Sequence, residues 1–144
     1  MHAGHLAAQA GFMDGLRAAA ARGAQVYGEC GGYMVLGAAL TDVDGEAHRM
    51  ADLLPLETSF AAPKLHLGYR QVRCAAAGPL GAAGAALRGH EFHYAAIGRE
   101  AAGTDGVEPL FAAADAAGND LGPAGLRKAN VAGSFVHLID RLDG

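Results

Sequence analysis

Apolar residues recur at helical spacing near the N-terminus of the chain. Between residues 4 and 22, Leu6, Phe12, Met13 and Leu16 occur at helical spacing among several alanines. Gly23 follows directly, and glycine commonly ends a helix because it adopts left-handed backbone angles without strain. The pattern predicts a helix over residues 4–22.

Short apolar runs, separated by polar or glycine-rich segments, make up the rest of the chain. They predict a strand at 24–28, a buried helix at 32–40 and strands at 57–62, 67–74 and 90–97, with a polar turn region at 41–49 and a low-complexity loop at 75–86. From residue 107 onward we expect successive strands, with turns at 118–120 and at Gly122-Pro123, and then a short helix at 138–142. A helix, a strand, a helix and then several strands predict an α/β layered domain.

Length and composition narrow the classes of function. The 144 residues are 51% hydrophobic and 18% charged, which favours one globular domain over 1–144. The net charge of −4 does not suggest nucleic acid or an anionic membrane as a partner, since these favour basic surfaces. No apolar run approaches the ~20 residues that span a bilayer. Two cysteines make no disulfide framework, so we expect a reducing, cytoplasmic compartment.

One of the two cysteines lies at a point typical of an active-site turn. Cys30 stands in the stretch GECGG, between a strand-like run and a helix-like run, and this is the form of a nucleophile elbow. Gly28, Gly31 and Gly32 supply small neighbours, the helix N-terminus favours the thiolate, and the Gly31 N–H can face an oxyanion. Cys74 ends a strand-like run without such a context, and we interpret it as structural and inert.

A cysteine nucleophile needs a base, and His137 is the best candidate among the seven histidines. It follows an apolar strand near the C-terminus, and α/β sheets carry their chemistry at the C-terminal ends of strands. The HEFH stretch is not a zinc motif. His90 and His93 are three residues apart in a β-prone run, so they should point to opposite faces. We therefore expect no metal site, and no phosphate-binding loop is present either.

Five stretches occur together in an order that resembles a known family. They are YGECGGYMVLG (27–37), LLP (53–55), LGYR (67–70), RGHEFHY (88–94) and GSFVHL (133–138). Nearly the whole chain resembles the C-terminal amidotransferase domains of the cobyrinic acid a,c-diamide synthases, in the class I glutamine amidotransferase branch shared with cobyric acid synthase. The resemblance implies a three-layer, flavodoxin-like α/β domain.

The resemblance also implies a reaction. Cys30 would attack the side-chain amide of glutamine to form a thioester, and His137 would take the thiol proton and protonate the departing ammonia. In this family, a separate N-terminal domain uses ATP and Mg²⁺ to activate carboxylates of cobyrinic or hydrogenobyrinic acid, so this chain itself would bind no cofactor. Its partners would be glutamine and, through that other domain, a corrinoid.

Two features depart from the family pattern. The family's amidotransferase domain begins earlier, with strands and a glycine-rich turn, so the fold is expected to be incomplete at the N-terminus and the ATP-dependent domain to be absent. The uncovered strand edge should let copies of the chain associate as a homo-oligomer. Many class I amidotransferases also carry a glutamate two residues after the histidine, and this chain has Ile139 there. Glu91 is one candidate to support His137, and Glu29 is expected to anchor the elbow by hydrogen bonds.

Two other functions fit some of these residues. An α/β-hydrolase with a cysteine nucleophile would also use an elbow and a later histidine, but it has no use for RGHEFHY. A catalytically inactive binding or interface module fits a chain that lacks part of its domain.

Overall fold

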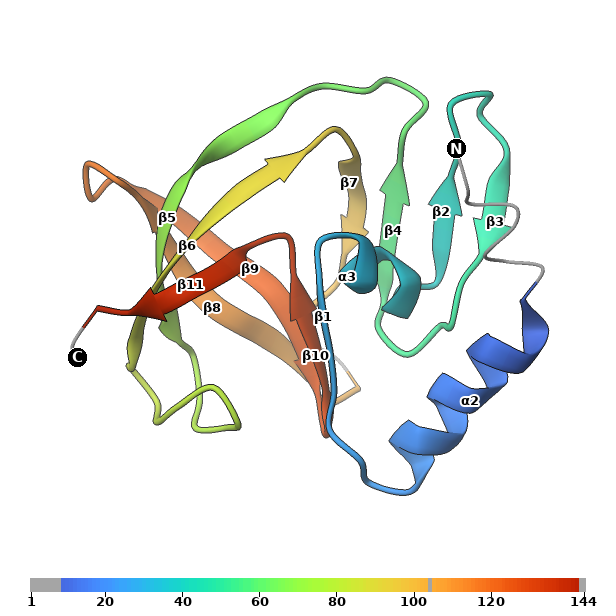
Figure 1. Ribbon diagram of the computed structural model, residues 1–144, viewed down its shortest axis with the longest axis horizontal. Coiled ribbons are helices and arrows are strands. Elements are labelled where there is room, and N and C mark those ends of the chain that lie inside the picture. The colour runs from blue at the N-terminus through green and yellow to red at the C-terminus, as the bar shows by residue number, and fades with distance from the viewer. Residues whose placement is uncertain (1–8, 104, 143–144) are drawn as a thin grey trace.

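The computed structural model describes residues 9–103 and 105–142, which form two helices and two β-sheets (Figure 1). The helices are α2 (Ala10–Ala21) and α3 (Gly31–Leu36). The strands are β1 (Val26–Glu29), β2 (Ala39–Thr41), β3 (Ala47–Arg49), β4 (Leu56–Ser59), β5 (His66–Cys74), β6 (Ala86–His93), β7 (Ala96–Glu100), β8 (Val107–Asp115), β9 (Asp120–Lys128), β10 (Val131–Ser134) and β11 (His137–Arg141). Neither described helix has the length and apolar character needed to cross a membrane.

The larger sheet is curled back on itself. Its strand order is β1-β10-β9-β8-β5-β6-β11, so β10 and β11 are five strand spacings apart, about 24 Å if the sheet were flat. Along the chain, however, only Phe135 and Val136 separate these two strands, and three residue steps reach about 11 Å at most. The sheet therefore has to curl until β11 comes close to β10, as Figure 1 shows.

The smaller sheet lies beside the curled one, with α3 between them (Figure 1). Its order is β3-β2-β4-β7. The helix buries Tyr33, Met34 and Leu36 in a core cluster that also contains Leu56 of β4 and Leu126 of β9. Both sheets thus share one core, and α3 is at its centre.

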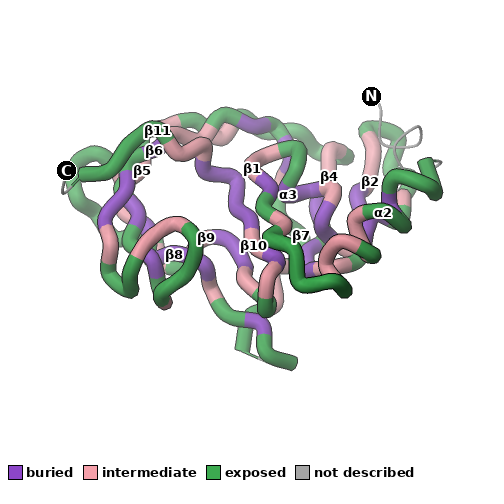
Figure 2. Tube along the Cα trace, turned by 60° about the horizontal axis from the view of Figure 1, so that its bottom comes forward, coloured by how far each residue is buried: buried purple, intermediate pink, exposed green. Residues whose placement is uncertain are grey.

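One face of the curled sheet forms a second core cluster. Val72, Cys74 and Leu87 pack there with Phe111 and Val136. Figure 2 shows buried positions recurring along the strands of this sheet. Cys74 is only 5% exposed, in agreement with its interpretation as a structural residue.

The α/β prediction is confirmed, and most predicted elements are present. The N-terminal helix is confirmed over Ala10–Ala21 and is followed by Gly23 at φ 86°; residues 4–8 of the prediction lie outside the described residues. The strands predicted at 57–62 and 67–74 correspond to β4 and β5. The turn predicted at 118–120 joins β8 to β9, with Gly118 at φ 88°.

The helix predicted at 32–40 is wrong in its second half. The helix ends at Leu36, because the backbone N–H of Ala38 donates a hydrogen bond to the carbonyl of Leu56 in β4 (2.8 Å). The following residues, Ala39–Thr41, therefore become strand β2. The region predicted as a polar turn, 41–49, contains the hairpin from β2 to β3.

Three predictions for the second half of the chain also need correction. The single strand at 90–97 is divided between β6 and β7, which belong to different sheets. Gly122-Pro123 lies within β9 rather than in a turn, and Gly122 has φ 80° beside a register shift. The helix predicted at 138–142 is strand β11, since pairing with β6 outweighs the weak helical tendency of five residues.

Two glycines allow α3 to lie directly on the β1–β10 pair. A Cβ atom on Gly133 would lie 2.5 Å from the Gly28 carbonyl oxygen and 2.6 Å from a ring carbon of Tyr33. A Cβ atom on Gly28 would lie 2.5 Å from the carbonyl carbon of Gly32. Real Cβ contacts are longer than this, so the helix can approach the strands only because both positions are glycine.

We expect Gly133→Ala to destabilise the domain by about 1–3 kcal/mol, because the methyl group overpacks the contact between Tyr33 and β10. Gly98→Ala is the matched control. Gly98 also lies in a strand, and its added Cβ would meet only the Glu57 carbonyl oxygen, at an ordinary 3.5 Å. Urea unfolding of the two variants measures the difference, and equal stabilities would contradict the packing described above.

Candidate active site

Cys30 occupies a strained turn between β1 and α3. Its backbone angles are φ 54° and ψ −109°, which a residue with a side chain adopts only at a cost of about 1–3 kcal/mol. Two hydrogen bonds hold this turn: the Cys30 N–H donates to the Ser134 carbonyl (2.9 Å), and the Cys30 carbonyl accepts from the Met34 N–H (3.1 Å). The strand–turn–helix geometry predicted around this cysteine is therefore present.

The glycines of the elbow do not all have the predicted role. Gly28 has the close contacts described above and is required sterically. Gly31 and Gly32, in contrast, have nothing within 4 Å of an added Cβ, and neither has a left-handed φ. The expectation that all three avoid steric clashes is thus wrong for Gly31 and Gly32, because α3 turns their α-carbons into open space. Gly133 is a required small neighbour that the local motif did not reveal.

The expected stabilisation of the thiolate is outweighed in the structure. Burial is the largest influence on the Cys30 thiol and raises its pKa; the Gly31 N–H lowers it, and the negative charges of Glu29 and Glu91 raise it further. The thiol donates a long hydrogen bond to the Phe92 carbonyl oxygen (3.9 Å). Near neutral pH the sulfur is therefore mostly protonated, and a nearby base is needed to make it a nucleophile.

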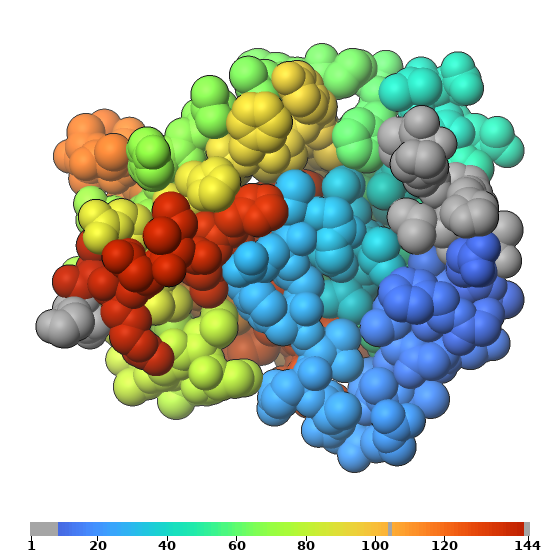
Figure 3. All heavy atoms as spheres, in the orientation of Figure 1, coloured from blue at the N-terminus to red at the C-terminus, as the bar shows by residue number. Residues whose placement is uncertain are grey.

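His137 lies close to the elbow because of strand pairing. Strands β1 and β10 are parallel, with Glu29 opposite Ser134, so Cys30 and His137 both follow strand ends at the same edge of the sheet. Figure 3 shows the C-terminal segment (red) against the β1–α3 segment (light blue) on one face of the molecule. In the described part of the chain, His137 interacts with Glu29 and His90. No hydrogen bond joins it to the Cys30 thiol there.

Glu29 connects the elbow to the histidine. Its Oε1 lies 3.9 Å from Nδ1 of His137, and its Oε2 accepts hydrogen bonds from the Leu138 N–H (3.2 Å) and the Tyr27 hydroxyl (3.0 Å). The expected anchoring of the elbow by Glu29 is thus present. His90 stacks on the His137 ring, with centroids 5.1 Å apart. Sequence reasoning missed Tyr27 and this stacking, although His90 lies in the RGHEFHY stretch.

The structure does not bring Glu91 to His137. Its two carboxylate oxygens bind Nε of Arg70 and Nε2 of His93, each at 3.0 Å. The hydrogen bond from His93 is the largest influence on Glu91 and lowers its pKa, with Arg70 acting in the same direction against the effect of burial. Glu91 is one residue from His90 along β6, so it faces the opposite side of the strand. The acid next to His137 is Glu29.

The two histidines of HEFH have different surroundings, as their alternation predicts. His90 stacks on His137, whereas His93 is buried and stacks on His66 and Phe135, with centroids 4.7 and 4.0 Å away. His93, His66, Glu91 and Phe135 line a cavity of about 350 Å³ on the inner side of β6. The HEFH histidines therefore do not converge on one metal ion.

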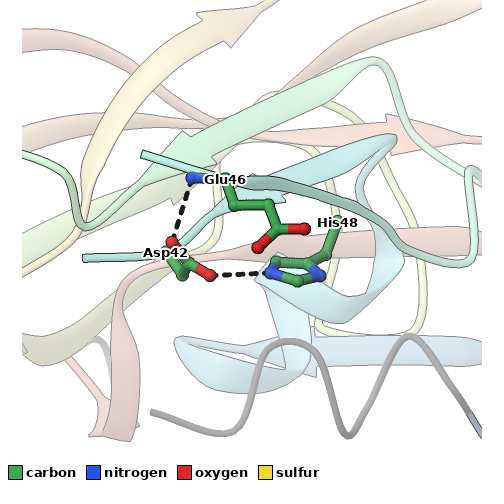
Figure 4. Close-up of side chains that lie close together, drawn as sticks. All are labelled: Asp42, Glu46 and His48. Carbon is green, nitrogen blue, oxygen red and sulfur yellow. Dashed lines mark hydrogen bonds and ion pairs between the residues drawn. The ribbon is translucent and has the colours of Figure 1, made fainter. Parts of the chain in front are cut away.

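A separate polar cluster lies in the β2–β3 hairpin and consists of Asp42, Glu46 and His48 (Figure 4). Asp42 accepts hydrogen bonds from the backbone N–H groups of Asp44 (2.9 Å) and Glu46 (3.0 Å), and its other oxygen lies 2.8 Å from Nε2 of His48. The hydrogen bond with His48 is the main cause of a lowered Asp42 pKa. These contacts are those of an aspartate that closes a hairpin turn.

Comparison with known proteins gives a consistent result. The family profile of the CobB/CobQ-like glutamine amidotransferase domain matches residues 1–141. The chain is 54% identical over 140 residues to a hydrogenobyrinate a,c-diamide synthase of Brucella anthropi and 53% identical over 144 residues to one of a Sinorhizobium species. In both cases the match covers 97% of this chain but only 30% and 31% of the relative, so the chain spans about a third of their length.

A solved structure also shares the fold. A crystal structure of a glutamine amidotransferase matches with a TM-score of 0.56 at 20% sequence identity, over 93% of this chain and 63% of the other. In the described residues of this chain, β1–β10 and β2–β4 are the parallel strand pairs.

We expect iodoacetamide to label Cys30 before Cys74, because Cys30 is partly exposed and Cys74 is buried. Since the pKa of Cys30 is raised, its labelling rate should still be increasing above about pH 8.5, the ordinary thiol value. Mass spectrometry of peptides alkylated at a series of pH values measures both effects. Faster labelling of Cys74, or a rate for Cys30 that levels off near neutral pH, would contradict these expectations.

Proposed function

This chain belongs to the CobB/CobQ-like glutamine amidotransferase domain family, and we propose that it is the glutaminase part of an amidotransferase that modifies a corrinoid. One observation carries the catalytic part of this proposal. Cys30 sits in a strained strand–helix turn at the end of β1, and His137 follows the end of the parallel strand β10.

In the proposed reaction, the Cys30 sulfur forms a bond to the side-chain amide carbon of glutamine, and His137 takes the thiol proton. The raised pKa of the thiol is consistent with this need for a general base. Negative charge that develops on the amide oxygen would be stabilised by the Gly31 N–H. The carbon–nitrogen bond then breaks, and His137 returns the proton to the departing ammonia.

A glutamyl thioester on Cys30 remains after ammonia leaves. His137 would remove a proton from an attacking water molecule, whose oxygen replaces sulfur on the carbonyl carbon. Glutamate leaves and the thiol is restored. The sum is glutamine plus water giving glutamate plus ammonia, and it consumes no cofactor in this chain.

The acceptor of the ammonia is proposed from the relatives. Those that match are named hydrogenobyrinate a,c-diamide synthases, so we propose that the ammonia amidates the a and c carboxylates of hydrogenobyrinic or cobyrinic acid. Carboxylate activation by ATP and Mg²⁺ would belong to the part of those proteins that this chain does not match. The α/β-hydrolase alternative no longer applies, because the family match covers residues 1–141. An inactive interface module remains the competing function.

We expect Cys30→Ser and His137→Gln each to lower the rate of glutamate release from glutamine by about 10⁴-fold, because loss of either the nucleophile or its base disables the same step. Cys74→Ala is the control. It should lower the stability of the domain, because it removes a buried sulfur atom, but it should retain the activity. An enzymatic glutamate assay on the purified proteins measures these rates.

A glutamine-like electrophile with a diazoketone in place of the amide gives a second readout that does not depend on turnover. It should add to Cys30 in the unmodified chain, and excess glutamine should protect against it. A chain that neither releases glutamate nor reacts with this reagent would support the inactive interface module instead.

A further inference from the structure

We propose that Glu29 is the positioning residue for His137. Glu29 ends strand β1, directly before the nucleophile, and its carboxylate orients the catalytic imidazole. This inference rests on the proposed role of His137 as the general base. It assigns a task to the residue that directly precedes Cys30 in the chain.

Strand geometry directs the Glu29 side chain towards the histidine. Tyr27 and Glu29 are two residues apart on β1, so their side chains share one face, and the tyrosine hydroxyl reaches Oε2. The same oxygen accepts the N–H of Leu138, which is 109 residues away in the chain. With Oε2 held by two donors, Oε1 is the oxygen that faces Nδ1 of His137, at 3.9 Å.

The imidazole is therefore held on two sides. Its edge faces the Glu29 carboxylate, and its flat face stacks on His90 with an interplanar angle of 18°. His90 is also the direct register partner of His137 in the β6–β11 pair, so the stacking is fixed by the sheet. Ile139, two residues after the histidine, is 55% exposed and carries no charge, so it cannot orient the ring.

A carboxylate beside Nδ1 would have a definite chemical effect. It favours the tautomer with the proton on Nδ1, which leaves the lone pair on Nε2 free to accept the thiol proton. It also stabilises the imidazolium that forms when this proton arrives. The 3.9 Å separation is longer than a hydrogen bond, in line with the looser contacts common in sites without substrate.

The effect of Glu29 on the cysteine points the same way. Its negative charge raises the pKa of the Cys30 thiol, so taken alone it opposes formation of the nucleophile. For this carboxylate to assist the reaction, it therefore has to act on a group other than the sulfur. In the described residues, the titratable group in an ion pair with Glu29 is His137.

Glu29→Gln tests this assignment sharply. The glutamine oxygen would have to take the place of Oε2, because the Leu138 N–H there can only donate, and the Tyr27 hydroxyl can donate to the same oxygen. Its NH₂ group would then face Nδ1 and favour the opposite tautomer, with the proton on Nε2. An analogous exchange of acid for amide in serine proteases lowers kcat about 10⁴-fold through the wrong tautomer.

We expect the ring ¹⁵N shifts of His137 to change from the Nδ1–H to the Nε2–H pattern in Glu29→Gln, measured by NMR on the folded chain. The kcat of glutamate release should fall about 100-fold or more, with KM within about threefold, because ground-state binding of glutamine is untouched. Glu57→Gln is the matched control and should change neither quantity, because Glu57 is an exposed strand glutamate that forms an ion pair with Arg99.

Two further variants keep the test decisive. Tyr27→Phe removes one hydrogen bond but keeps the carboxylate, so it should retain the Nδ1–H pattern. If Glu29→Gln does not fold, Glu29→Asp takes its place. It moves the charge back by one carbon and should leave a mixture of the two tautomers. An unchanged tautomer in the folded glutamine or aspartate variant overturns the role of Glu29.

The two proposals fail in different ways. Labelling of Cys30 by the glutamine analogue, together with an unchanged His137 tautomer in Glu29→Gln, overturns the positioning role and leaves the glutaminase intact. The opposite result is a shifted His137 tautomer in Glu29→Gln, with neither labelling of Cys30 nor glutamate release by the unmodified chain. It would support the interaction between Glu29 and His137 but overturn the catalytic function, and with it the positioning role of Glu29.

Discussion

The parallel pairing of β1 with β10 is the constraint on which the rest of the site depends. It sets Glu29 opposite Ser134, and the N–H of Cys30 extends the ladder by donating to the Ser134 carbonyl. Because parallel neighbours end at the same edge, the residues that follow the two strands must meet there. The nucleophile candidate follows one strand and the base candidate follows the other, although most of the chain lies between them.

Close packing holds the elbow in its strained form. Gly28 and Gly133 let α3 sit against both strands, and Tyr33 of the helix donates a hydrogen bond to Glu100 of β7 (2.6 Å). The helix is thereby tied to the curled sheet on one side and to the smaller sheet on the other. A left-handed backbone at Cys30 persists only when its surroundings leave it no alternative, and these contacts provide that restraint.

Electrostatics near the sulfur favour a neutral thiol at rest. Burial and two carboxylates, Glu29 and Glu91, raise its pKa, while the charge of Glu91 is largely engaged by Arg70 and His93. The thiol in such a site becomes reactive when a nearby group accepts its proton, because it is not already ionised at rest. In the proposed mechanism that acceptor is the imidazole of His137, which lies 3.9 Å from the Glu29 carboxylate. The proposed site would thereby differ from cysteine sites that rely on a helix N-terminus alone.

The sequence by itself determined the α/β class, the N-terminal helix, the elbow around Cys30 and the candidacy of His137, because these depend on local periodicity and on glycines next to one cysteine. It misjudged the helix end at Leu36 and the C-terminal segment His137–Arg141, whose conformations are decided by pairing with β4 and β6. Only the tertiary structure separated Gly28 and Gly133 from Gly31 and Gly32, and Glu29 from Glu91. The reason is that steric contact and carboxylate partners depend on strand register, which joins residues that the sequence keeps far apart.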